Sequence, residues 1–211
     1  MNAYHEQRSY LCVVGLIILL STATAVAGAE EKNGPQAGEI GAIEYIVLAT
    51  SKTSTMEKEL NESAEAGYQF RQVMGGETSF GGNEVVVVTS RPIGGMAASR
   101  FQYKLLATSK TSTMQKELQE ASDAGFYAVG QTVFTSTFGG DETVIILERD
   151  TERSDFPHYE YRLLATKKTS TLENELKEAG DAGYDLVGLT VSKTTFGGTE
   201  LVSVMRRKLD P

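Results

Sequence analysis

One short unit is written three times in this chain, and this repetition limits the fold more than any other feature of the sequence. The segments Tyr45–Arg91, Tyr103–Arg149 and Tyr161–Arg207 align without a gap, at an offset of 58 residues both times. The shared frame runs from Tyr-x-[VL]-Leu-Ala-Thr through Lys-Thr-Ser-Thr, Glu-Leu-x-Glu and Ala-Gly-aromatic to Phe-Gly-Gly-x-Glu, and it ends on Arg. Repeats usually correspond to structural units. Because the period is longer than that of most solenoid repeats, we expect three small modules in tandem.

Each copy begins with the pattern of a strand and a helix. The segment 45–50 (YIVLAT) alternates between two sets of side chains, which is typical of a half-buried strand. Met56, Leu60 and Ala64 then recur at the spacing of one helical face. A glycine follows where a left-handed residue commonly ends a helix. We therefore predict helices at about 54–66, 112–124 and 170–182, each ended by its own glycine: Gly67, Gly125 and Gly183.

Two strands complete each copy. The second is expected to start at Tyr68, Phe126 or Tyr184, and a Gly-Gly pair of tight-turn type precedes the third. Since the first and second strands flank a helix, they should be parallel. The third should be antiparallel to the second, and pairing with the first is also open. The fold class is thus α+β: three tandem β-α-β-β modules, each a three-stranded sheet with one helix, packed through their sheets.

The segment after the third helix resembles a known family. The run Ala-Gly-Tyr-Asp-Leu-Val-Gly at 182–188, after a Leu-rich amphipathic helix and before a hairpin, is similar to the bacterial family catalogued as domain of unknown function 4177. That family pattern has a Tyr-led strand and a Gly-Trp-Glu-Leu-Val-like segment after the helix. This chain has Tyr or Phe in place of Trp, and the first copy (GYQFRQV) departs further. The resemblance implies the fold and carries over no functional residues, because the family has no established activity.

The faces of the predicted strands suggest that the modules pack together. Val86 and Val88 are expected to face the helix of the first module, and Val85 and Val87 to face away from it. An apolar outer face of that size needs a partner. We expect it to be covered by a neighbouring module, by a continued sheet or by another chain. The candidate interface residues are Leu48, Leu106 and Leu164, expected to point away from their own helices, and the aromatic hairpin tips Phe80, Phe138 and Phe196.

The N-terminus reads as an export signal. An uninterrupted apolar run at 11–20 follows Arg8, and Ala-Gly-Ala at 27–29 fits a cleavage site. The expected location is secreted or periplasmic, the alternative being an N-terminal membrane anchor. The predicted boundaries are a signal peptide at 1–29, an N-terminal linker at 30–43, modules at 44–91, 102–149 and 160–207, linkers at 92–101 and 150–159, and a tail at 208–211.

Composition argues against several classes of function. The net charge of −8 gives no general attraction to nucleic acid or to an anionic membrane surface. Beyond the signal, the chain has no cysteine and only His158, in a linker. Nucleophilic catalysis by Ser-His or Cys-His systems, and metal sites of the same residue types, are therefore disfavoured. We expect no catalytic residues, no metal and no cofactor.

The start of each helix offers the one recurrent candidate site. Ser54 with Glu57 three residues later fits a capping box, as do the pairs Ser112 with Gln115 and Ser170 with Glu173. A lysine and hydroxyls beside free helix N–H groups could also hold an anion. The candidate anion-binding residues are Lys52, Thr53, Ser54, Lys110, Thr111, Ser112, Lys168, Thr169 and Ser170.

The predicted function is that of a non-enzymatic, exported repeat protein, with protein interaction or a structural part of the envelope or exterior as its role. Its expected partners are another protein or a second copy of itself. The alternative is a small-ligand or anion binder that uses the Lys-Thr-Ser-Thr loops.

Overall fold

In the computed structural model the described residues are 42–79, 82–94, 100–135, 140–193 and 198–209, and Ile40–Pro211 forms one compact unit. The first module contains strand β1 (Ile43–Thr50), helix α1 (Thr53–Glu65), strand β2 (Gln69–Thr78) and strand β3 (Gly82–Pro92). The same order recurs in β4 (Phe101–Thr108), α2 (Thr111–Asp123), β5 (Tyr127–Thr135) and β6 (Asp141–Asp150), and again in β7 (Tyr159–Thr166), α3 (Thr169–Asp181), β8 (Asp185–Lys193) and β9 (Thr199–Lys208). The predicted α+β class and threefold repeat are confirmed.

The last strand of each module lies in the middle of its sheet. The sheet orders are β1-β3-β2, β4-β6-β5 and β7-β9-β8, and both outer strands pair antiparallel with the central one. The two strands that flank the helix are therefore parallel, as predicted, but they are not neighbours in the sheet. One residue is skipped in the register at the same place in all three copies, next to Phe70, Ala128 and Leu186.

The helix boundaries follow the prediction closely, but the predicted serine caps are wrong. Lys52 is the N-cap residue of α1, and no side chain of the described residues caps the helix. The Lys52 N–H is itself bonded to the Thr50 hydroxyl at 3.3 Å. The helix thus begins one residue earlier than predicted, which puts Ser54 inside the first turn, and α2 and α3 start in the same way. The predicted C-terminal glycines are confirmed, with φ of 84°, 83° and 82°.

The arginine that closes each copy holds the end of its helix. The Arg91 guanidinium donates to the carbonyl oxygen of Ala66 at 2.9 Å and lies 4.4 Å from the centre of the Tyr68 ring. Arg149 and Arg207 make the same two contacts in the other modules. A cation at the last carbonyls of a helix interacts favourably with the helix dipole. The shared terminal Arg of the repeat therefore ties the central strand to the helix.

Both faces of each central strand are apolar, and the assignment of the faces by sequence is wrong. Val85 and Val87, both fully buried, pack with the apolar stripe of α1 in one cluster. Val86 and Val88, predicted to face the helix, lie on the other side. Strict alternation separates two sets of residues, but it cannot say which set a helix covers when both sets are apolar.

Leu48 and Leu106, predicted to point away from their own helices, also face them. Leu106 is 6% exposed and lies in the cluster that contains Leu118 of α2. The predicted burial of Leu106 is confirmed, but the predicted direction is wrong. Its neighbour Leu105 points the other way and packs against the cluster of α1.

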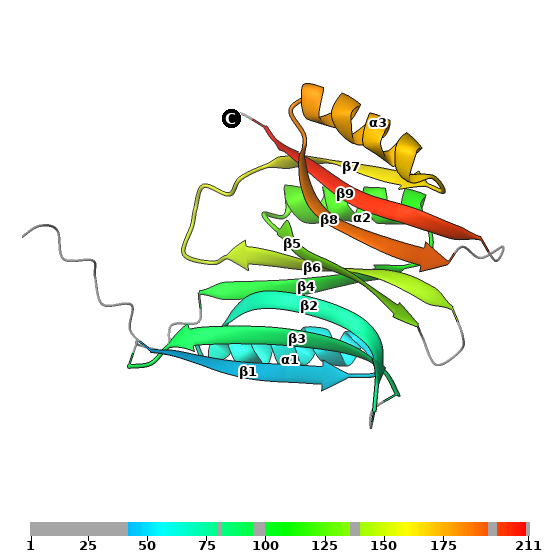
Figure 1. Cartoon of the computed structure of the whole chain (residues 1–211). Coiled ribbons are helices and arrows are strands. Elements are labelled where there is room, and N and C mark those ends of the chain that lie inside the picture. Colours follow the sequence, from blue (N-terminus) through cyan, green and yellow to red (C-terminus); the bar gives the residue numbers. More distant parts are fainter. Residues whose placement is uncertain (1–41, 80–81, 95–99, 136–139, 194–197, 210–211) are drawn as a thin grey trace, which may run out of the picture. The chain divides into compact units, whose positions relative to one another are not determined.

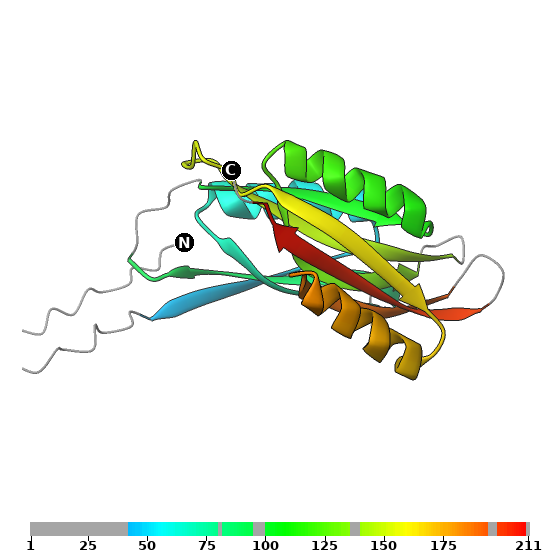
Figure 2. The same ribbon diagram turned by 90° about the horizontal axis from the view of Figure 1, so that it is seen from above.

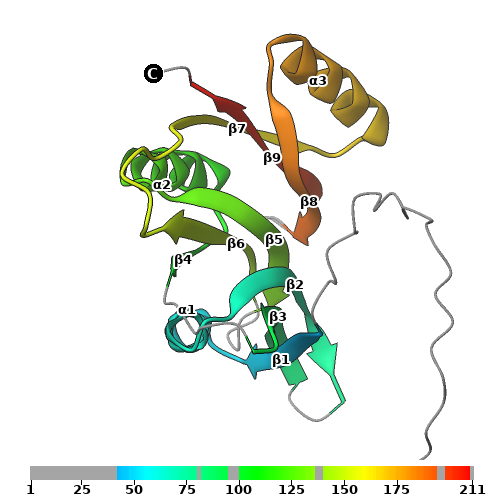
Figure 3. The same ribbon diagram turned by 90° about the vertical axis from the view of Figure 1, so that its left-hand side faces the viewer.

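Each of the first two helices lies between its own sheet and the next one. Val144 and Ile146 on β6 belong to the cluster of α1, and Val204 on β9 belongs to the cluster of α2. The same pairs of elements meet twice: α1 with β4 and β2 with β5, then α2 with β7 and β5 with β8. In the views of Figures 1 and 2 the third sheet lies between α2 and α3. Figure 3 shows the three modules following one another in chain order.

Candidate interaction surfaces

A buried tyrosine hydroxyl connects the first module to the second. Tyr103 on β4 is 3% exposed, and its hydroxyl accepts a hydrogen bond from the backbone N–H of Phe70 at 2.9 Å. The same hydroxyl donates to the Glu148 carboxylate at 2.7 Å. Burial, and next the Glu148 charge, raise the pKa of Tyr103 well above its usual range. The hydroxyl therefore stays a hydrogen-bond donor at any physiological pH.

Side chains of α1 bind the free edge of β4. The Asn61 side chain donates to the Tyr103 carbonyl and accepts from the Tyr103 N–H, both at 2.9 Å. The Glu57 carboxylate accepts from the Leu105 N–H at 2.8 Å. An uncovered strand edge invites pairing with another chain. Glu57, predicted to complete a capping box, thus covers an edge strand of the following module.

The contact between the second and third modules repeats this chemistry. Tyr161 is 2% exposed, and its hydroxyl accepts from the backbone N–H of Ala128 at 2.8 Å. Gln115 accepts from the Leu163 N–H at 2.9 Å and donates to the Tyr161 carbonyl. Gln119 donates to the Tyr159 carbonyl at 3.1 Å. We call the contact between modules 1 and 2 the first joint and the contact between modules 2 and 3 the second joint. Residues at equivalent repeat positions form hydrogen bonds at both joints.

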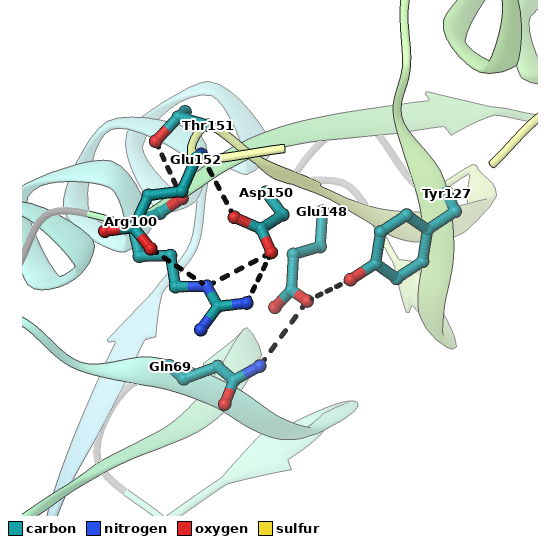
Figure 4. A network of polar contacts seen from close by, with 7 residues as sticks. All are labelled: Gln69, Arg100, Tyr127, Glu148, Asp150, Thr151 and Glu152. Atoms are coloured by element: carbon teal, nitrogen blue, oxygen red, sulfur yellow. Dashed lines mark hydrogen bonds and ion pairs between the residues drawn. The ribbon is translucent and has the colours of Figure 1, made fainter. Parts of the chain in front are cut away.

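A polar network borders the first joint (Figure 4). Glu148, 3% exposed, accepts from the Tyr127 hydroxyl at 2.6 Å and lies 3.5 Å from the Gln69 amide of the first module. Asp150 on the same strand forms an ion pair with Arg100, at 2.6 Å. The Arg100 hydrogen bond holds the pKa of Asp150 below its usual range. Glu148 therefore bonds across the joint, whereas the Arg100–Asp150 pair joins the two ends of module 2.

Module 1 is the first module of the described residues, and its side that corresponds to the joined faces of modules 2 and 3 is apolar and open. Tyr45 occupies the place of Tyr103 and Tyr161, yet it is 60% exposed. Val47, at the position of Leu105, is 64% exposed. We call this surface the Tyr45 face; its exposed apolar members are Ile43, Tyr45, Val47 and Met74. No hydrogen bond among the described residues reaches the outer edge of β1.

Module 3 is the last module of the described residues, and its outer side is also apolar and open. Leu186, at the position of Phe70 and Ala128, is 45% exposed. We call this surface the Leu189 face; its exposed apolar members are Leu186, Leu189 and Val191 of β8. On α3 beside it, Glu173 and Lys177 occupy the places of Glu57 and Asn61. They bond to each other at 2.6 Å in solvent.

The candidate anion loops lie at the starts of three separate helices. Lys52, Lys110 and Lys168 are exposed, and nothing in the described residues brings one loop next to another. One hollow contains Thr108, Lys110 and Thr111 together with Glu200 of β9, and another contains Thr53 and Ser54 together with Glu57. A carboxylate therefore stands among the hydroxyls in both places, and it opposes an anion.

The remaining sequence candidates are placed as follows. Phe80, Phe138 and Phe196 lie outside the described residues. Leu48 packs against the cluster of α1, and Leu164 is half-buried on β7. Within the described ranges no group of three or more His, Cys, Asp or Glu residues could hold a metal ion, and no helix is long and apolar enough to cross a membrane.

Sequence reasoning missed the residues that form the joints. The sequence did contain a signal for them: all three copies begin with a tyrosine, at Tyr45, Tyr103 and Tyr161. An edge strand by itself does not need a hydroxyl group at this position, so its recurrence indicates a bonding role. The capping-box pattern accounts for Glu57 and Gln115 equally well in the sequence, which hides their role at the joints. Comparison of the chain with known proteins finds no matching family model, no matching curated protein and no matching solved structure.

Proposed function

We propose that this protein is a non-enzymatic, exported repeat protein that binds another protein through its two end faces. The single observation that carries the proposal is where the exposed apolar residues lie. Of the large apolar side chains that are exposed among the described residues, the Tyr45 face and the Leu189 face contain all but Ile93 and Leu209. Contiguous exposed apolar surface commonly marks a protein interaction site.

The chemistry of the joints supports this role. Inside the chain, the same two kinds of face are buried against each other by apolar packing, a tyrosine hydroxyl and side chains bonded to a strand edge. At the ends these groups are retained but open. In repeat proteins the terminal repeats usually carry a polar outer face for solubility. Two apolar ends therefore favour a protein with partners over one that works alone.

Export, and the likeness to the domain of unknown function 4177 family, are parts of the same proposal. Export rests on the apolar run at 11–20 and the small residues at 27–29. It can be tested by sequencing the N-terminus of the protein recovered from its source. A start near Glu30 is expected, and retention of the first 29 residues would favour the membrane-anchored alternative.

Photo-crosslinking in the native source tests the interaction. A benzoylphenylalanine replaces Val47 on the Tyr45 face or Val191 on the Leu189 face, and Lys58 serves as the matched control because its side chain is 76% exposed on α1 outside both faces. Adducts with protein are expected at positions 47 and 191 but not at 58. If neither end face gave a protein adduct, the proposal would be wrong.

The anion-binding alternative has less support. Glu57 and Glu200 lie beside two of the candidate loops. A polyanion-binding screen with Lys110→Ala as the comparison separates the two functions. Binding that depends on Lys110 would favour the alternative.

A further inference from the structure

We infer that the partner of each end face is a second copy of this chain, so that module 3 of one molecule joins module 1 of the next. This inference rests on the proposed function and names its partner. The two ends are the two halves of a joint that the chain already forms twice. A contact between different surfaces of identical subunits is heterologous, and it extends into a ring or a filament.

Most hydrogen-bonding groups at the two ends match; the exception is the N–H of Tyr45, because Lys177 has no acceptor where Asn61 and Gln119 accept from Tyr103 and Tyr161. In both joints a tyrosine hydroxyl accepts from the backbone N–H beside the bulge of the preceding module. At the ends, Tyr45 offers the hydroxyl and Leu186 the equivalent N–H. In both joints the N–H at the position of Val47 bonds to a side-chain oxygen of the preceding helix. Glu173 supplies that oxygen on α3.

The carbonyl oxygens at the outer edge of β1 also have a matching donor on α3. The carbonyl oxygens of the first strand accept hydrogen bonds from Asn61 at the first joint and from Gln115 and Gln119 at the second. Lys177 stands at the position of Asn61 and is a donor as well. Since Glu173 and Lys177 bond to each other at 66% and 67% side-chain exposure, they can exchange that surface ion pair for the edge of β1 at little cost.

One residue makes the end joint weaker than the internal ones. A β-carbon at Gly130 would lie 2.6 Å from the Phe70 ring, and one at Gly188 would lie 2.7 Å from the Gln131 side chain. Module 1 carries Gln72 at this position, and Gln72 is exposed. Its side chain must move aside before Leu186 and its neighbours can approach. Association between chains is therefore weaker and reversible, while the internal joints stay closed.

Complementary variants test the head-to-tail geometry. The sample is the chain from Glu30 onward, because Ile40–Pro211 forms one compact unit. Sedimentation velocity should show wild-type protein growing beyond a dimer as its concentration rises. Val47→Asp blocks one face and Leu189→Asp the other, so each variant alone should remain a monomer. Mixed in equal amounts, they should form a one-to-one dimer and nothing larger, because each retains the face that the other lacks.

The substituted residues are 64% and 48% exposed, so the variants should fold, and circular dichroism with thermal melting checks that they do. Gln72→Gly should shift assembly to lower concentration. A wild type that stays monomeric while position 47 still gives adducts in the native source would overturn the self-partner and leave the proposed function intact. A dimer in either aspartate variant alone, no dimer in the mixture, or no effect of Gln72→Gly would also overturn it. So would a crosslink from position 47 to the residues before Ala42 of the same chain.

Discussion

Replacing the first tyrosine of each module by phenylalanine makes the same chemical change at two joints and at one open end. The loss of stability should therefore differ between the joints and the end. Tyr161→Phe removes the hydroxyl that accepts from the Ala128 N–H, and both residues are nearly inaccessible, at 2% and 1% exposure. A buried donor left without a partner costs about 1–3 kcal/mol. Tyr45→Phe makes the same deletion at 60% exposure, where water replaces the bond and the change should stay within about 0.5 kcal/mol.

Tyr103→Phe should be the most damaging of the three. It leaves the Phe70 N–H without a partner and also removes a hydrogen bond to the charged Glu148. Bonds to charged groups contribute about 1.5–3 kcal/mol each. Because Glu148 keeps the bond from the Tyr127 hydroxyl at 2.6 Å, the sum should be about 2–5 kcal/mol.

Urea unfolding of the three variants, at concentrations where the protein is a monomer, measures the order. With a slope of about 2 kcal/mol per molar urea, each kcal/mol moves the midpoint by about 0.5 M. The expected order of destabilisation is Tyr103, then Tyr161, then Tyr45. If Tyr45→Phe were as damaging as Tyr161→Phe, the hydroxyl would not act through the joint, and the assignment of the joints would be refuted.

Three further predictions concern single modules. Gly183→Ala should destabilise the third module by about 1–2 kcal/mol, because φ is 82° there and the added β-carbon meets only ordinary contact; thermal melting measures the cost. Ser112→Ala should change the melting temperature by less than Gly183→Ala, since Ser112 is exposed and caps nothing in the described residues; a loss near 1 kcal/mol would restore the capping box. Asp150→Asn should destabilise the protein at neutral pH. Because Arg100 lowers the folded pKa of Asp150, that stabilisation is present above about pH 4 and is lost as the pH falls through the folded value. The difference between wild type and variant in urea should therefore shrink below about pH 4, and a constant difference would contradict the ion pair.

Most of the fold could be predicted from the repeat, because local sequence patterns determine where strands, helix ends and turns lie. The left-handed glycines and the helix limits could be predicted for this reason. The facing of Val85 and Leu106 could not be predicted, since both sides of their strands are apolar and alternation does not say which side the helix covers. The role of Glu57 was hidden because a helix start and a strand edge make similar demands on a carboxylate. The joints could not be predicted, because the repeat pattern describes a single module and does not say how one module contacts the next.

The central position of each module's last strand has a consequence for synthesis. Within the described part of the chain, β1 and β2 share no backbone hydrogen bond, and each pairs only with β3. A growing chain that stops before Gly82 therefore has a helix and two separate extended segments but no sheet to bury them. The hairpin of β2 and β3 closes a short loop and should form quickly, whereas docking of β1 closes the whole module and should follow. Completion of each module thus waits for its final ten or so residues, and the strand edge of the next module can be covered only after the preceding helix is already in place.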